Sequence, residues 1–163
     1  MLIPAVTGYD LVMAVHIMAV VIAFGWTFAL PIVFAIASKR DPRSLPLLHH
    51  VEVMVSRWML NPALVVILGA GIYLASDGHH WSEFFVQWGL AAIVVIGGLV
   101  GSVLMPASRR AEAAVERDLQ AWNGEGEFQP GAEYAAIAQR IAVAGSLASG
   151  LVLLTILFMT IKP

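Results

Sequence analysis

Four long stretches of the chain contain no Asp, Glu, Lys or Arg, and they constrain the fold more than any other feature. They cover residues 11–38, 58–76, 84–108 and 141–161. A helix needs about 20 apolar residues to cross roughly 30 Å of hydrocarbon. Helices of soluble proteins rarely stay uncharged for so long, because one face meets water. Backbone groups in lipid must be satisfied within the segment, so we expect helices. The sequence therefore predicts an all-α fold, a four-transmembrane-helix bundle.

The composition agrees with a chain that lipid covers. Of its 163 residues, 60% are hydrophobic and 12% are charged, whereas a soluble domain has about 25% charged residues. The length fits one integral membrane domain, residues 1–163. The chain has no cysteine, which excludes disulfides, thiolate nucleophiles and Cys-ligated metals. A net charge of −2 gives no reason to expect a nucleic-acid partner.

We expect the spans at about 10–38, 48–76, 84–106 and 134–161, with a cytoplasmic extension of helix 3 at about 107–123. The extension has apolar side chains at helical spacing, namely Ala111, Val115, Leu119 and Trp122. Prolines inside the first two spans, Pro31 and Pro62, can kink their helices. Small residues predict packing faces; these are Gly69, Gly97, Gly101, Gly145, Ser149 and Gly150.

Basic residues predict the orientation. Eight of the nine fall on one side of the predicted membrane and only Lys162 on the other; the eight are Lys39, Arg40, Arg43, Arg57, Arg109, Arg110, Arg117 and Arg140. Because Lys and Arg accumulate in cytoplasmic connections, we expect both termini outside, in a bacterial cytoplasmic (inner) membrane. The first span has no basic residue before it and exceeds a signal-peptide core of about 7–15 residues, so we interpret it as a retained helix.

A polar cluster is predicted near the outer face. His16 lies six residues inside Asp10, or about 9 Å along the helix. The 77–83 loop brings His79 and His80 to the same side. Imidazoles bind metals and haem iron, so His16, His79 and His80 are candidate metal ligands. The plainer alternative for His16 is a hydrogen bond to a neighbouring helix.

A second polar cluster is predicted near the inner face, from His49, His50, Arg57 and Arg140. One interpretation is an ion-pair network of Glu52 with Arg57 or Arg140. The other is that an arginine binds an anionic group, such as a carboxylate, a haem propionate or a lipid headgroup. His16 and Arg57 are separated by about 25 Å along the membrane normal, so a haem on His16 should turn its propionates outward. Alternatively, haem binds through His49 or His50.

The spans resemble those of a group of small bacterial membrane proteins. The segment His16-IMAVVIAFG-Trp26 resembles the first helix of the copper-resistance D-like proteins and of the HemJ-type protoporphyrinogen oxidases. The second span, Arg57-WMLNPALVVILGAGIYL, and the closing FMTIKP are similar to the same group and to an uncharacterised integral-membrane family near it. The resemblance implies that His16 contacts haem b or a metal, and it pairs Arg57 and Lys162 with basic residues of the group. The acidic segment 107–127 has no counterpart.

Three functions follow as hypotheses. The first is a haem b-binding or related redox protein. The second is a non-enzymatic accessory or scaffold subunit that associates with lipid and with a partner membrane protein or further copies of itself. The third is handling of copper or another small solute, which the apolar centres of the spans disfavour. No carboxylate pair, Ser-His-Asp set or phosphate loop indicates hydrolysis.

Overall fold

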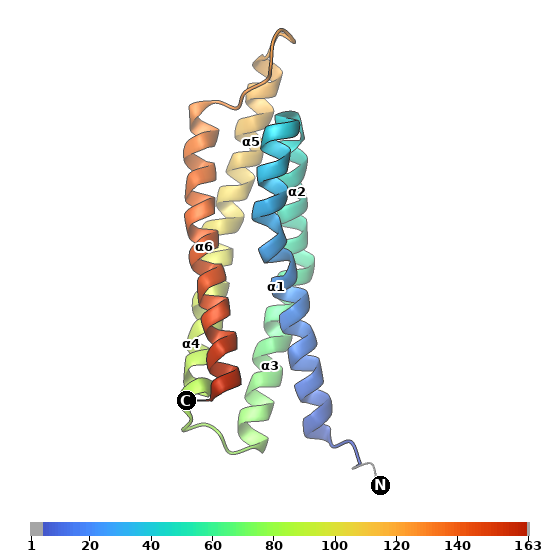
Figure 1. Cartoon of the computed structure of the whole chain (residues 1–163), viewed down its shortest axis with the longest axis vertical. Coiled ribbons are helices and arrows are strands. Elements are labelled where there is room, and N and C mark those ends of the chain that lie inside the picture. The colour runs from blue at the N-terminus through green and yellow to red at the C-terminus, as the bar shows by residue number, and fades with distance from the viewer. Residues whose placement is uncertain (1–4, 163) are drawn as a thin grey trace.

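The computed structural model describes residues 5–162 and, within them, forms helices and connections but no strand. Pro163, from the terminal Lys-Pro pair, lies outside this range. Four long helical rods lie side by side in an up-and-down bundle (Figure 1). Each rod is long and apolar enough to cross a membrane. The prediction of an all-α fold is confirmed for residues 5–162, and its four long apolar helices are compatible with an integral membrane protein.

The first rod is α1 (Gly8–Arg40) and the fourth is α6 (Ala132–Ile161). The second and third rods are composite. The second joins η1 (Pro42–Ser44), α2 (Leu45–Val55), η2 (Ser56–Leu60) and α3 (Asn61–Asp77). The third joins α4 (Phe84–Leu99), η3 (Val100–Leu104) and α5 (Met105–Ala121). The start of α1, the 78–83 turn and the end of α6 lie at one end of the bundle, and the 122–131 loop lies at the other (Figure 1).

A wide π-helical turn precedes a proline in both composite rods. Proline has no N–H and its ring clashes with the carbonyl four residues earlier. In η2 the N–H of Asn61, just before Pro62, bonds to Ser56 O. In η3 the N–H of Met105, just before Pro106, bonds to Val100 O. The longer i to i+5 bond accommodates the proline within the rod. By contrast, α1 continues as an α-helix through Pro31.

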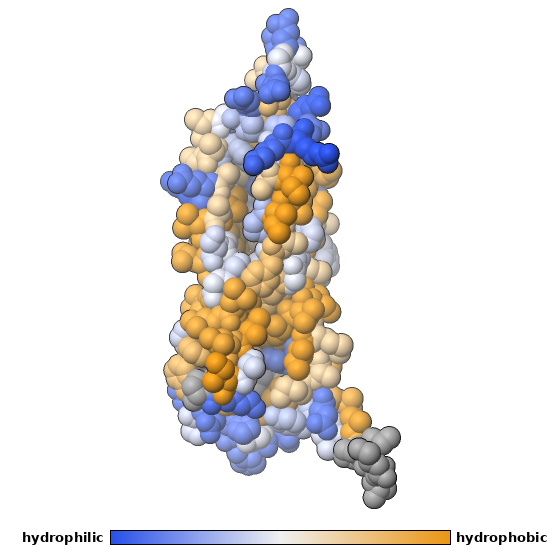
Figure 2. Space-filling model, in the orientation of Figure 1, coloured by the Kyte–Doolittle hydropathy of each residue, from blue (hydrophilic) through white to orange (hydrophobic). Residues whose placement is uncertain are grey.

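The buried side chains form two cores, which divide the bundle into two halves. The first core joins α1, α3, α4 and α6 through Ala19, Ala23, Phe24, Leu60, Ala63, Leu64, Ile67, Ile96, Val100 and Val152. We call this region the apolar half. The second core joins α2, α5, α6 and the 122–131 loop through Leu45, Ala111, Ala114, Val115, Phe128 and Tyr134. We call this region the charged half. Figure 2 shows a largely orange surface over the lower part of the bundle and mixed blue and white side chains towards the loop end.

The predicted extension of helix 3 is part of the bundle. Residues 105–121 form α5, which continues the third rod, and Ala111 and Val115 of the expected apolar stripe are fully buried. The end of α1, α2 and the start of α6 accompany α5 along its length. The second rod has 36 residues, or about 54 Å of helix, against roughly 30 Å of hydrocarbon. All four rods, and not helix 3 alone, are therefore longer than the hydrocarbon core of a membrane is thick.

The predicted glycine packing faces do not pack within the chain. A methyl group placed on Gly69, Gly97 or Gly101 has no heavy atom within 4 Å, and the same holds for Gly145 and Gly150. Two other glycines do allow close approach. The ring of His16 lies 3.5 Å from the Cβ position of Gly71, and a side chain at Gly89 would run into Met159. Whether the five open glycines form packing faces with another molecule stays a prediction.

Candidate functional site

His16 lies where α1 contacts α3. Its Nδ1 is 3.1 Å from the backbone oxygen of Ile67. A carbonyl only accepts, so this ring nitrogen is the one that carries the proton and donates. The absence of a side chain on Gly71 leaves room for the imidazole against α3. The contact meets the plainer expectation of a helix-to-helix hydrogen bond. In the neutral imidazole the second nitrogen, Nε2, is then the unprotonated one.

His79 and His80 lie in the turn between α3 and α4. His79 has a left-handed backbone (φ 57°), and its Nδ1 is 3.1 Å from Asp77 O. The ring of His80 lies beside that of Phe85, with centroids 6.0 Å apart. Across residues 5–162, no three His, Cys, Asp or Glu side chains lie together in a way that could hold a metal ion. The structure therefore does not bring His16, His79 and His80 into one ligand set.

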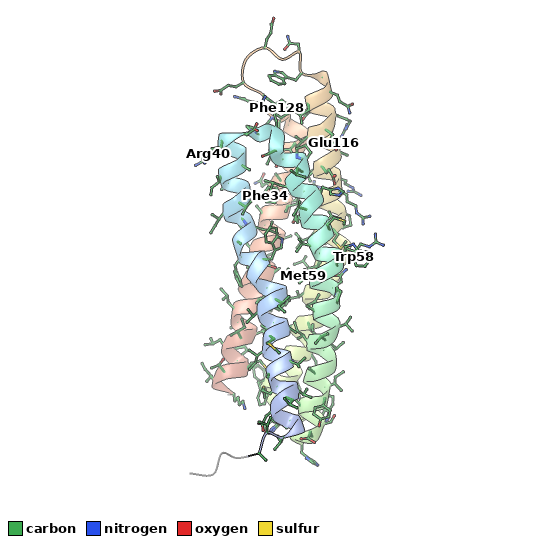
Figure 3. The ribbon with its side chains drawn as sticks, turned by 90° about the vertical axis from the view of Figure 1, so that its right-hand side faces the viewer. Phe34, Arg40, Trp58, Met59, Glu116 and Phe128 are labelled. Atoms are coloured by element: carbon green, nitrogen blue, oxygen red, sulfur yellow. The ribbon has the colours of Figure 1, made fainter. Side chains whose placement is uncertain are left out.

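His49 is the most buried ionisable residue of the charged half, at 2% exposure. Its Nδ1 is 3.3 Å from Glu52 Oε2 and its Nε2 is 3.3 Å from the hydroxyl of Tyr134 on α6. If Nδ1 donates to the carboxylate, Nε2 accepts from the phenol, which gives a Tyr134-to-His49-to-Glu52 chain. Phe34 of α1 packs on the imidazole, with ring centroids 4.6 Å apart. Figure 3 shows Phe34 between the helices of the bundle.

This cluster corrects the expected ion-pair network. Glu52 pairs with His49, and none of the ion pairs within residues 5–162 joins it to Arg57 or Arg140. Glu52 and Arg57 are five residues apart, which places them about 140° apart around the helix at 3.6 residues per turn. Both nitrogens of His49 already have partners, which leaves none for haem iron. Tyr134 and Phe34 complete the cluster, and no pattern in the sequence predicted that they would.

The other predicted inner residues face outward. His50 Nδ1 is 2.9 Å from Glu112 Oε1 on α5, and the His50 side chain is largely exposed. Arg57 lies over the ring of Trp58, 5.5 Å from its centroid. Figure 3 shows Trp58 projecting from the outer surface of the bundle. His49, His50 and Arg57, which were predicted to form one inner site, therefore lie on different sides of the second rod.

Arg140 is exposed at the edge of a shallow groove on α6. The groove has a volume of about 350 Å³ and an almost wholly apolar lining, formed by Leu99, Gln139, Val143, Ala144 and Leu147 together with Arg140. A groove with one cation at its edge suits an amphiphile better than a compact polar solute.

A larger hollow of about 570 Å³ lies at the loop end, between residues 38–43 and the 122–131 loop. Arg43, in its wall, is engaged locally, because its Nε is 2.9 Å from Asp41 Oδ1. The hydrogen bond from this guanidinium holds the pKa of the Asp41 carboxyl below its ordinary value. The loop-end hollow is thus lined partly by charges that already neutralise each other.

No family model, curated protein or solved structure matches the chain. The class of the protein therefore follows from its own fold. It is a multi-pass membrane protein whose four helices are each of spanning length.

Proposed function

We propose that this protein binds haem b through Nε2 of His16 and acts as a membrane redox protein, as its resemblance to the HemJ-type group implies. One observation carries the proposal, namely the contact between His16 Nδ1 and Ile67 O. Histidines that ligate metals almost always donate their other ring N–H to a carbonyl or carboxylate, which fixes the tautomer and the ring orientation. His16 is held in this way.

The surroundings of His16 have the apolar character that a haem macrocycle needs. The core within two turns of it is built from small and aliphatic side chains, such as Ala19, Ala23 and Ile67. Haem, when bound, would supply one-electron chemistry. The chain would hold the imidazole, keep Nε2 unprotonated and exclude water. Attachment through His49 is less favoured because both of its ring nitrogens are engaged within the protein.

The proposed orientation places both termini outside a bacterial inner membrane and the charged half in the cytoplasm. Its support is the excess of Lys and Arg at the loop end, since basic residues accumulate on the cytoplasmic side. His16 then belongs to the outer part of the membrane, and haem propionates would face the end where His79 and His80 lie.

A spectrum of the purified full chain tests the proposal. We expect protein from haem-replete bacterial cells to show a Soret band with about one haem per chain, and His16→Ala to lose it. His50→Ala is the matched control, because that histidine is exposed and pairs with Glu112. Gly71→Leu should also lower haem content, because its side chain meets the imidazole. A colourless, folded protein, or an unchanged Soret band in His16→Ala, would reject haem binding at this residue.

A second candidate is an accessory or scaffold subunit, with a partner membrane protein or a second copy against its lipid-facing surface. The glycines that meet nothing within the chain favour it, since small residues let transmembrane helices approach closely. Recovery of a stoichiometric partner together with a haem-free protein would favour this candidate. The third hypothesis is handling of copper or a small solute. Within residues 5–162, no cluster of three metal-binding side chains supports it.

A further inference from the structure

Two contacts fix the register of α5 against α6. Arg117 Nη2 lies 2.9 Å from Glu133 Oε1, and the N–H of Gly131 donates to Asp118 Oδ2 at 2.8 Å. The two helices are antiparallel, so each step back along α5 corresponds to a step forward along α6 (Figure 1). Arg117 and Glu133 therefore mark facing positions on the outer side of this helix pair.

Two turns nearer the apolar half, two arginines occupy the corresponding positions. Residues seven apart on a helix share a face, so Arg110 follows Arg117 on α5 and Arg140 follows Glu133 on α6. The shift amounts to about 10 Å along each helix. The helices remain packed at this level, because Ala111 is fully buried in the charged-half core and Ile141 packs against it. The opposite charges of the first pair are thus replaced by two like charges.

Neither arginine has an acidic residue three or four positions away on its own helix. The positions three and four residues away are apolar on both sides, namely Pro106, Ala107, Ala113 and Ala114 around Arg110, and Ala136, Ile137, Val143 and Ala144 around Arg140. Within residues 5–162, no ion pair includes Arg110 or Arg140. If the register set by Arg117 and Glu133 continues for two turns, Arg110 and Arg140 face each other, and two facing cations repel each other unless an anion lies between them.

The surface next to this pair is apolar on the membrane side. The groove of about 350 Å³ begins at Arg140 and continues along α6 past Val143, Ala144 and Leu147, with Leu99 of α4 on its other wall. Arg140 and Ile161 are 21 residue steps apart on α6, or about 32 Å, which is close to the thickness of a hydrocarbon core. A hydrocarbon core that covered this length would place Arg140 at headgroup depth and the groove at acyl-chain depth.

We propose that Arg110 and Arg140 together bind the phosphate of an anionic phospholipid, with one acyl chain in the groove on α6. Guanidinium groups present planar donors that match phosphate oxygens. Basic pockets between transmembrane helices are a recurrent form of anionic lipid site. The site is separate from His16 and does not depend on haem.

Thermal unfolding of the delipidated full chain in mild detergent tests this site. Phosphatidylglycerol should raise Tm in a concentration-dependent manner. Phosphatidylcholine with the same acyl chains, and inorganic phosphate, should raise it much less. Arg110→Gln and Arg140→Gln should each weaken the apparent affinity for phosphatidylglycerol about tenfold or more, as expected for loss of a charged hydrogen bond.

Arg109→Gln is the matched control. It removes the same charge at the same depth, but Arg109 lies on a different face and has Glu112 three residues away. Leu147→Trp leaves both arginines in place and fills the groove, so it should weaken lipid binding without changing the net charge. An equal loss in Arg109→Gln would show a non-specific charge effect and overturn the proposal. Equal stabilisation by inorganic phosphate, or unchanged affinity in Arg110→Gln and Arg140→Gln, would overturn it as well.

Discussion

The two halves of this bundle use their polar side chains differently. In the apolar half most hydroxyls bond to the backbone of their own helix, as Ser76, Ser102 and Thr160 do. In the charged half the polar groups connect different helices, through His49 with Tyr134, His50 with Glu112, Arg117 with Glu133, and Asp118 with the Gly131 N–H. Two inter-helix bonds occur in the apolar half, His16 with Ile67 and Trp88 with Thr155.

This difference is what two different solvents, lipid for the apolar half and water for the charged half, would produce. In lipid, burial of an apolar side chain lowers the free energy very little, because the surrounding acyl chains are apolar as well. Large residues of the apolar half such as Val65 and Val94 remain exposed, each at 70%. In water, apolar burial drives packing, and Ala111, Val115 and Leu45 are almost completely enclosed. We therefore expect the same four rods to contain a lipid-solvated bundle continued by a bundle of soluble type.

The largest effect should come from the buried polar cluster of the charged half. His49→Leu removes the partner of the Glu52 carboxylate and leaves that group enclosed without compensation. Leaving a buried polar group without its hydrogen-bond partner costs about 1–3 kcal/mol, and this change does so for both Glu52 and the Tyr134 hydroxyl. We expect a loss of this size in the free energy of unfolding, measured in detergent with a chemical denaturant.

A double variant separates packing from charge at this cluster. His49→Leu combined with Glu52→Leu should recover much of the loss, because both polar groups are then replaced by apolar ones. If His49→Leu costs less than about 1 kcal/mol, water reaches Glu52, and the charged half does not have a dry core of its own.

Matched substitutions on the outer surface should come next in size. Val65 on α3 and Leu47 on α2 are similarly exposed, at 70% and 65%, and lie on the same rod but in different halves. An aspartate near the middle of a transmembrane helix costs about 2.5–3.5 kcal/mol on insertion scales. An aspartate on a water-exposed helix face costs about 0.5 kcal/mol or less.

We therefore expect Val65→Asp to reduce membrane insertion strongly, whereas Leu47→Asp leaves it nearly unchanged. Fractionation of the expressed protein between membrane and soluble or degraded pools measures the difference. Equal losses for the two variants would place Leu47 in lipid and would shift the membrane boundary far into the charged half.

The spans could be predicted from sequence because charge is excluded from lipid over a whole helix length, as in residues 58–76 and 141–161. The stripe that contains Ala111 and Val115 could be predicted because packing follows the helical period. The pairing of His49 with Tyr134 joins residues 85 apart, and it depends on the register of two rods, which no local pattern encodes. Wide turns accompany Pro62 and Pro106 but not Pro31, so the proline alone does not predict them.

The glycines show a related limit. A spacing such as Gly97 and Gly101 identifies a surface suited to close helix contact, but the same pattern serves contacts within the chain and contacts with another molecule. Only the structure shows that nothing in this chain approaches them. The prediction of metal ligands has the same limit. Depth along a helix places His16, His79 and His80 at one end of the bundle, but it does not show whether their side chains converge.

The smallest effect should come from the surface pair Arg117 and Glu133, and it tests the solvent of the charged half directly. Both side chains are more than half exposed, at 62% and 63%. In water such a pair contributes little and is screened by salt, since the Debye length falls to about 3 Å at 1 M. Arg117→Gln should therefore lower Tm by no more than about 2 °C at low salt, and the difference from the unchanged protein should vanish at high salt. Glu133→Gln is the matched variant and should behave in the same way. A larger shift that resists salt would mean that the pair lies in a medium of low dielectric, and the charged half would then belong to the membrane rather than to the water beyond it.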